Sequence, residues 1–453
     1  MPTLRTVTGN ASILQGNSFQ AEDATALDPR TRGMIEHRTK RLGPAYRLFY
    51  RRPVELVRGR GAHAWDADGI EYLDMYNNVP SVGHAHPAVV EAVHRQMEQL
   101  NTHTRYLHEG ILAYADDLLG TMPDELDQVM FVCTGSEAND LALRVGREHT
   151  GGAAWIATSE AYHGNTALVS AHSPSLAGAE TMDPALRIVA PPDTYRHRSS
   201  EAAGAAFLAE VGAAIDAVDR AGDGLAGIIL DTSFSSDGVF TGHAGMIHAA
   251  VRLVQEHGGV VIADEVQPGF GRTGEAFWGF QRHGIVPDIV TTGKPMGNGF
   301  PVAAMAARRA VLEPFAQRRP YFNTFGGNPV AIAAAQAVLD TIRREGLADR
   351  ALVVGEQLRS GLRDLAEQHP GIGDVRGAGQ YTGVELVVDR ATQEPATALA
   401  LNLLEQLRER RVLTSVCGPA SNVLKLRPPL AFTEADVPRV LEALDGGLTA
   451  LGA

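Results

Sequence analysis

Two residues with demanding chemistry each follow a short apolar run in the middle of the chain. Residues 260–263 are followed by Asp264, and residues 289–292 are followed by Gly293 and Lys294. Short runs rich in β-branched residues and bounded by turn formers are typical of buried parallel strands. Open α/β sheets bind ligands at the carboxyl ends of such strands. We therefore expect the Asp264 carboxylate and the Lys294 amine to lie in one site.

Taken alone, each residue has a plainer interpretation. An Asp after a strand is often a turn former or a helix cap, and a Lys in a Gly-rich loop is often a solvated charge. The surroundings of Lys294 favour a reactive lysine over a solvated one, because its neighbours are Thr, Gly and Pro, with almost no other charge nearby. A lysine held among small groups can lose its hydration, which lowers its pKa and makes the neutral amine available for a Schiff base.

The segments that contain these residues, ADEVQPGFGRTG and PDIVTTGKPMGNGFPVAA, resemble the pyridoxal 5′-phosphate (PLP) core of the class III aminotransferase family. The resemblance implies that Lys294 forms the Schiff base with PLP and that Asp264 pairs with the pyridine nitrogen. It also implies that Val266 and Gln267 pack against the ring and its hydroxyl. A carboxylate at the ring nitrogen keeps it protonated, and a cationic ring is the better electron sink.

Two upstream turns match the same family. The strand-like run VMFV leads into CTGSEAND, where backbone N–H groups at a helix start can bind an anion. In isolation the stretch around Gly135 and Ser136 is a plain helix cap, whereas the resemblance places both residues at the PLP phosphate. An aromatic residue after a strand is usually part of the core, but Tyr162 in AYHG matches the family's ring-stacking residue.

The resemblance covers residues 42–448, and its narrower match is to alanine–glyoxylate aminotransferase 2-like proteins and ethanolamine-phosphate phospho-lyases. NTHTRYLHE, APPDTYR and NVLKLRPP carry that match. It implies an α/β fold, PLP-dependent fold type I. The large PLP-binding domain, with a mostly parallel seven-stranded sheet, would span residues 66–328. A smaller α+β domain would span residues 329–453, and residues 1–65 would pack with it. A homodimer with shared sites is also implied, because Thr324 matches a position that reaches the partner's PLP phosphate.

The substrate side of the site departs from the usual family pattern. Asp231 ends the predicted strand GIILD and is followed by Phe234, where the family usually has Glu and then Gln. Many family transaminases bind the substrate carboxylate with an Arg three residues before the Pro-Pro pair, and here that position is Lys425. Lys is a point charge that suits a phosphate, and Arg427 adds a second cation for a dianion. On a strand, residues two apart share a face.

These observations predict a PLP-dependent phospho-lyase that acts on a small phosphorylated amine such as O-phosphoethanolamine. The products would be an aldehyde, ammonia and inorganic phosphate. The first alternative is an aminotransferase that moves an amino group from an amine or amino acid to pyruvate or glyoxylate. The others are a non-catalytic PLP-binding paralogue and an unrelated α/β protein that binds nucleotides through its Gly-rich turns.

Composition excludes several other classes. Of the 453 residues, 44% are hydrophobic and 21% are charged, as in ordinary globular proteins. No run of apolar residues is long enough for a membrane helix, and the N-terminus lacks the pattern of a secretory signal. The 2 cysteines favour a reducing cytoplasm, and a net charge of −13 without a basic block argues against nucleic acid. His84 and His86 lack ligand-spaced partners, so we expect no metal site.

Overall fold

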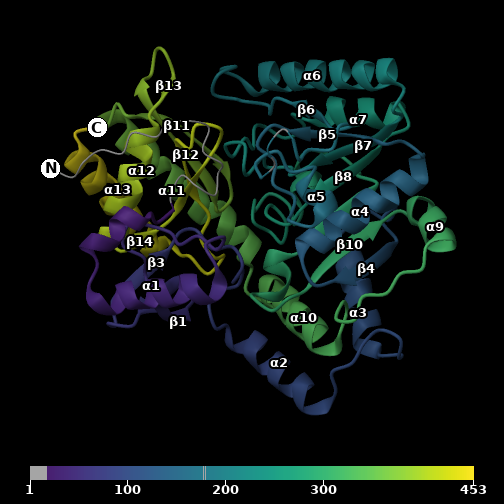
Figure 1. Ribbon diagram of the computed structural model, residues 1–453, viewed down its shortest axis with the longest axis horizontal. Coiled ribbons are helices and arrows are strands. Elements are labelled where there is room, and N and C mark those ends of the chain that lie inside the picture. The colour runs from purple at the N-terminus through teal and green to yellow at the C-terminus, as the bar shows by residue number, and fades with distance from the viewer. Residues whose placement is uncertain (1–17, 177, 179) are drawn as a thin grey trace.

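A seven-stranded sheet lies at the centre of the larger part of the computed structural model, which describes residues 18–176, 178 and 180–453 (Figure 1). The strand order is β4-β10-β9-β8-β7-β5-β6. The strands span Gln128–Val132, Ala303–Ala307, Ile289–Thr292, Val260–Asp264, Leu225–Leu230, Ala154–Thr158 and Arg187–Val189, in that order. β10 is antiparallel to β4 and β9, and the other pairs are parallel. The predicted mostly parallel seven-stranded sheet is confirmed.

Helices cover both faces of this sheet because its strands are apolar on both sides. Val260 and Ile262 face a core shared with α4 and α9, whereas Val261 and Ala263 face a core shared with α6, α7 and α10. This alternation is the period of a strand. The helices of this part are α2 (Pro87–Gln99), α3 (Glu109–Leu119), α4 (Gly135–Thr150), α5 (Ala167–Ser170), α6 (Ser200–Ala221), α7 (His248–Glu256), α8 (Gly279–Arg282), α9 (Arg309–Arg318) and α10 (Pro329–Arg344).

The smaller part is built on a second sheet in the order β11-β12-β16-β15, with β13 beside β12. These strands span Ile372–Ala378, Tyr381–Asp389, Val423–Leu426, Ser415–Cys417 and Glu394–Pro395. Three helices pack on one apolar face of it, α11 (Leu347–Gln368), α12 (Thr397–Glu409) and α13 (Val437–Leu451). The opposite face is turned toward the larger part.

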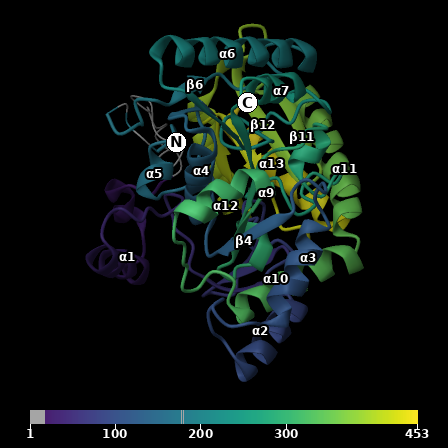
Figure 2. The same cartoon turned by 90° about the vertical axis from the view of Figure 1, so that its right-hand side faces the viewer.

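N-terminal strands join the smaller part through a third sheet, β1-β2-β3-β14. Its strands are Leu56–Arg60, His63–Asp66, Glu71–Asp74 and Val412–Leu413, and α1 (Pro29–Leu42) precedes them. Tyr50 also donates a hydrogen bond of 2.7 Å to the carbonyl of Thr414. The remaining helical turns are η1 (Ala21–Ala26), η2 (Lys294–Gly297) and η3 (Glu434–Asp436). α2 projects at one end of the molecule in both views (Figures 1 and 2).

The two hydrophobic cores divide the chain at residues other than the two predicted domain limits. Leu73 and Met75 lie in the core of the smaller part, so the N-terminal segment extends past the expected limit at residue 65. α10 packs its apolar face into the core of the larger part, so residues 329–344 belong there rather than to the small domain. Residues 1–17 lie outside the described residues. The division into domains stays a proposal, with limits near residues 76 and 346.

None of the helices in the described part of the chain has both the length and the apolar character that a membrane crossing requires. The same residues contain no group of three or more His, Cys, Asp and Glu side chains suited to a metal ion. His84 lies 2.8 Å from Asp74, and His86 lies 3.4 Å from Glu345.

Candidate active site

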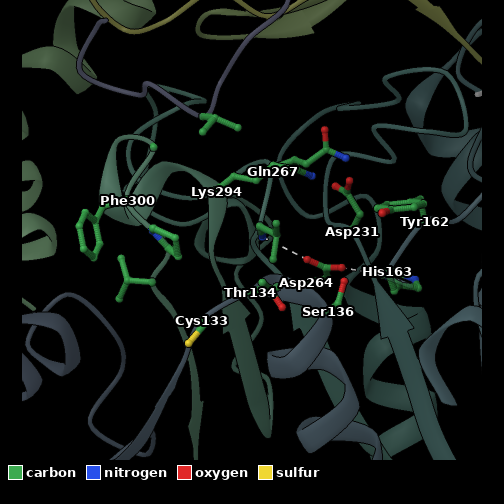
Figure 3. Close-up of a pocket in the computed structure, with 17 residues that line it drawn as sticks. Cys133, Thr134, Ser136, Tyr162, His163, Asp231, Asp264, Gln267, Lys294 and Phe300 are labelled. Atoms are coloured by element: carbon green, nitrogen blue, oxygen red, sulfur yellow. Dashed lines mark hydrogen bonds and ion pairs between the residues drawn. The ribbon is translucent and has the colours of Figure 1, made fainter. Parts of the chain in front are cut away.

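A cavity of about 280 Å³ lies at the carboxyl ends of β7, β8 and β9 (Figure 3). Asp231 follows β7, Asp264 ends β8 and Lys294 follows β9, and all three line the cavity. The wall also contains other residues predicted from the sequence, namely Gly135, Ser136, Tyr162, Val266 and Gln267. Parallel strands that end at one edge of a sheet therefore bring together residues from five separate segments of the chain.

The Asp264 carboxylate is buried and held on one side by two polar neighbours. Its Oδ2 accepts a hydrogen bond of 2.9 Å from Asn139 Nδ2 and lies 2.7 Å from His163 Nδ1. Its Oδ1 accepts the backbone N–H of Val266 at 3.1 Å. The side-chain Oδ1 of Asn139 in turn accepts a hydrogen bond of 2.6 Å from the Thr291 hydroxyl. These contacts fix the direction of the carboxylate and leave Oδ1 with a free lone pair.

The Lys294 amine faces the cavity without a hydrogen-bond partner among the described residues. Its Nζ lies 5.9 Å from the ring centroid of Tyr162. Although the side chain keeps some surface in the cavity, the amine is surrounded by protein. This burial, with the nearby positive charge of Arg427, lowers the pKa of Lys294 to about 8, partly offset by Asp264 and Asp231. A usable fraction of the amine is thus neutral near pH 7.

The start of α4 forms a narrow cradle for an anion. Thr134 caps the helix, and the next residue, Gly135, has no room for a side chain, because a Cβ there would lie 2.9 Å from Val266 Cγ2. Gly164 has φ +144°, and a Cβ there would lie 2.6 Å from Ser136 Oγ. Gly135 and Ser136 both line the cavity, and the Ser136 hydroxyl oxygen accepts the backbone N–H of Asn165 at 3.2 Å. Such a helix start binds phosphate readily.

Sequence reasoning missed the contacts that hold these groups in place. Asn298, with φ +50°, ends the turn that begins with Lys294. Its Oδ1 accepts the N–H of Val82 and its Nδ2 donates to the carbonyl of Gly83, both at 2.9 Å. Asn between two glycines in GKPMGNG was the available signal for a left-handed turn. The Asn139 and His163 contacts to Asp264 come from α4 and from the turn after β5, and they had no local signal.

Lys425 and Arg427 do not line the cavity, although both lie close to it. They are 6% and 5% exposed. Arg427 donates Nη1 to the Gln267 side-chain oxygen and Nε to the Tyr76 carbonyl at 3.1 Å. The Lys425 amine has no hydrogen bond or ion pair within the described residues. Burial and the positive charge of Arg427 lower the pKa of Lys425 to about 7.

Thr324 is also absent from the cavity wall. It lies in an exposed loop between Phe322 and Phe325, which are 47% and 69% exposed. The neighbouring Asn323 has its Oδ1 4.0 Å from the Sγ of Cys133, which does line the cavity. In one chain, then, Thr324 borders the mouth of the site but does not enter it.

A family model described as "Aminotransferase class-III" matches residues 49–448. The chain belongs to this family. It is an enzyme, its cofactor is PLP, and the predicted PLP-dependent fold type I is confirmed. The alternative of an unrelated nucleotide-binding protein is wrong.

Relatives with two different activities resemble the chain over nearly its whole length. An alanine–glyoxylate aminotransferase 2-like protein of Drosophila melanogaster is 39% identical, covering 92% of this chain and 87% of the relative. An ethanolamine-phosphate phospho-lyase homolog of Caenorhabditis elegans is 37% identical, covering 94% of this chain and 95% of the relative. The structure of an Arthrobacter phospholyase in complex with phosphoethanolamine is 40% identical, with a TM-score of 0.88 over 92% of this chain and 99% of the other.

The cavity fits PLP on three observations. Lys294 presents an amine that no described group binds, and Asp264 keeps a free lone pair on a fixed carboxylate. The glycine-lined helix start at Gly135 leaves room where a phosphate needs backbone contact. A small-molecule amine substrate agrees with the relatives, whereas the cytoplasmic location stays a prediction.

Proposed function

We propose that this enzyme eliminates phosphate from a small phosphorylated amine such as O-phosphoethanolamine. The observation that carries the proposal is the buried Lys425 amine of β16, which has no hydrogen bond or ion pair among the described residues and lies close to Arg427, one residue beyond the end of that strand. A buried cation without a partner is costly, and a dianionic phosphate would neutralise it. The resemblance to the phospholyase structure and to the C. elegans homolog supports the same substrate class.

The cofactor contacts are proposed from the geometry of the cavity. Lys294 would bind the PLP aldehyde, and Asp264 would pair with the ring nitrogen through its free Oδ1 lone pair. Tyr162 would stack on the ring. The phosphate would lie at the start of α4, where backbone N–H groups and the Ser136 hydroxyl would bind it. The remaining wall residues Val266 and Gln267 would pack against the ring and its hydroxyl.

In the proposed reaction the Lys294 amine takes a proton from the amino-bearing carbon of the substrate, as its lowered pKa allows. When bound, PLP supplies the ring that accepts the electron pair left at that carbon. The C–O bond to phosphate on the neighbouring carbon then breaks. Phosphate leaves toward Lys425 and Arg427, and water converts the released enamine to acetaldehyde and ammonia.

Asp231 interacts electrostatically with both lysines, because its negative charge raises the pKa of Lys294 and the pKa of Lys425. Burial, together with the negative charge of Asp264, raises the pKa of Asp231 itself. Asp231 also lines the cavity, where a substrate would bind. We therefore propose Asp231 as a substrate-side group beside Lys425 and Arg427.

We also propose a homodimer in which Thr324 enters the site of the partner. Support comes from the exposed apolar surface around this loop, since monomers rarely expose contiguous apolar patches of this kind. Beside Phe322 and Phe325, the residues Tyr106 and Leu107 are 66% and 99% exposed. The ring of Phe322 lies 5.8 Å from that of His103, so the two loops are neighbours.

An aminotransferase remains the second candidate, because the Drosophila relative carries that name at 39% identity. The two reactions differ in what they require. Elimination from O-phosphoethanolamine releases phosphate without a keto acid, whereas amino transfer needs an acceptor such as pyruvate or glyoxylate for continued turnover. Phosphate and acetaldehyde release without any keto acid is the expected result. No phosphate release, together with transfer from alanine to glyoxylate, would overturn the proposal.

A further inference from the structure

One face of the smaller sheet presents a row of three residues to the larger part of the molecule. Arg376 of β11 is directly opposite Gly383 of β12, and Gly383 is directly opposite Lys425 of β16. Side chains at directly opposite positions of antiparallel strands point to the same face. Arg376 and Lys425 therefore flank a gap, because the residue between them has no side chain.

The loop after β7 fills this gap. A Cβ on Gly383 would lie 3.1 Å from Val239 Cβ and 3.4 Å from the Gly238 carbonyl oxygen. Val239 is fully buried in a cluster with Tyr381 and Val423, which lie on the same face of the sheet. Residues 231–239 are thus seated between the two parts of the molecule.

Arg376 contacts this loop through its guanidinium group. Its Nε and Nη2 donate to the Gly238 carbonyl oxygen at 2.9 and 2.7 Å, and its guanidinium lies 4.5 Å from the ring centroid of Phe240. Its Nη1 lies 2.8 Å from carboxylate oxygens of both Asp374 and Glu385. The carboxylates hold the guanidinium toward the larger part, where it contacts the Gly238 carbonyl and the Phe240 ring.

The loop needs such a hold because its backbone is strained. Phe234 and Val239 have φ +50° and +61°, a region that residues with bulky or branched side chains rarely adopt. Asp231 at the start of the loop lines the cavity. Near the other end, Asp237 accepts the Thr158 hydroxyl at 2.9 Å, which ties the loop to the end of β5.

We propose that Arg376 is a positioning residue: it holds residues 231–239 in the gap at Gly383 and thereby fixes the Asp231 carboxylate in the cavity. The strain of the loop would otherwise relax and move Asp231 away from the substrate. The role is the same for elimination and for amino transfer, so it does not depend on which reaction the enzyme catalyses.

The test compares two variants that weaken, in different ways, the contact between residues 231–239 and the smaller sheet. Arg376→Lys keeps the charge but loses the paired contact with one carbonyl oxygen. Gly383→Ala keeps every charge and fills the gap. The matched control is Arg390→Lys, since Arg390 donates only within the smaller part, to the carbonyls of Ile372 at 2.8 Å and His369 at 3.0 Å.

Two readouts are needed, both on the holoenzyme. Hydrogen exchange followed by mass spectrometry should show residues 231–240 exchanging about tenfold faster in Arg376→Lys and Gly383→Ala, as expected for losing one charged hydrogen bond. The KM for whichever amine is turned over should rise by about the same factor with kcat nearly unchanged. Arg390→Lys should change neither.

Unchanged exchange at residues 231–240 in both variants would overturn the proposal. So would faster exchange spread evenly over β11, β12 and β16, because Arg376 would then only stabilise the sheet. Faster exchange of the loop with an unchanged KM would show that the loop does not position Asp231. Failure to release phosphate would refute the proposed elimination but would leave the exchange result intact.

Discussion

Replacing Lys425 tests whether its charge binds the substrate phosphate. The pKa of Lys425 is lowered to about 7 in the free protein. Its charged fraction then falls from about one half at pH 7 to about one tenth at pH 8. A phosphate monoester stays a dianion over this range, because its second pKa is about 6. Since the dianion binds the charged form, the KM for O-phosphoethanolamine should rise about fivefold over that unit of pH.

Two variants separate this effect from other titrations. Lys425→Arg keeps its charge at every pH in the range, so its KM should stay flat. Lys425→Met keeps most of the stem but loses the charge-assisted hydrogen bond, which contributes about 1.5–3 kcal/mol, so its KM should rise about 10- to 150-fold. Lys294 is the same in all three proteins, so its own titration cancels in the comparison.

The assay is the initial rate of phosphate release at saturating PLP, measured at several substrate concentrations for each pH. An amine without phosphate, offered with a keto acid, serves as the substrate control and should show no Lys425-dependent change. Coincident pH profiles for the unmodified enzyme and Lys425→Arg would refute the reasoning. A KM for Lys425→Met within about twofold of the unmodified value would do the same.

Three further perturbations test the cofactor contacts and the dimer. Asp264→Asn should lower kcat at least about 10²-fold, since the ring nitrogen loses its anionic partner, and a near-normal rate would show that another group holds that role. Gly135→Ala should weaken PLP binding, measured by equilibrium dialysis, because its Cβ would lie 2.9 Å from Val266 Cγ2; unchanged affinity would contradict the cradle. Mixing inactive Lys294→Ala chains with inactive Thr324→Glu chains should restore about a quarter of the activity through hybrid dimers, and full activity from a verified monomer would exclude the shared site.

The sequence predicts those features that depend on local pattern or on the family resemblance. The strands that end at Asp264 and before Lys294 are readable from apolar runs bounded by turn formers, and the structure contains both as β8 and β9. The helix start at Gly135 is readable in the same way. The family resemblance supplied the mostly parallel seven-stranded sheet and the cofactor, which such local patterns do not encode.

Features that depend on contacts between distant segments escaped prediction. Asn139 and His163 reach Asp264 from α4 and from the turn after β5, and neither segment carries a local sign of that contact. The domain limits stay a prediction, because the apolar face of α10 does not reveal in the sequence that it packs in the core of the larger part. The conformation of residues 231–239 was equally hidden, since positive φ at Phe234 and Val239 contradicts the preference of both residue types.

The measurement that tests the proposed elimination most directly is the stoichiometry of phosphate release from O-phosphoethanolamine in the complete absence of keto acid. Without an acceptor, amino transfer stops after one turnover per subunit and releases no phosphate. Elimination continues, because nothing is left on the enzyme. We predict that phosphate, acetaldehyde and ammonia accumulate in equal amounts, far beyond one equivalent per subunit. A reaction that stops at one equivalent of substrate consumed, with no phosphate released, would contradict the proposal.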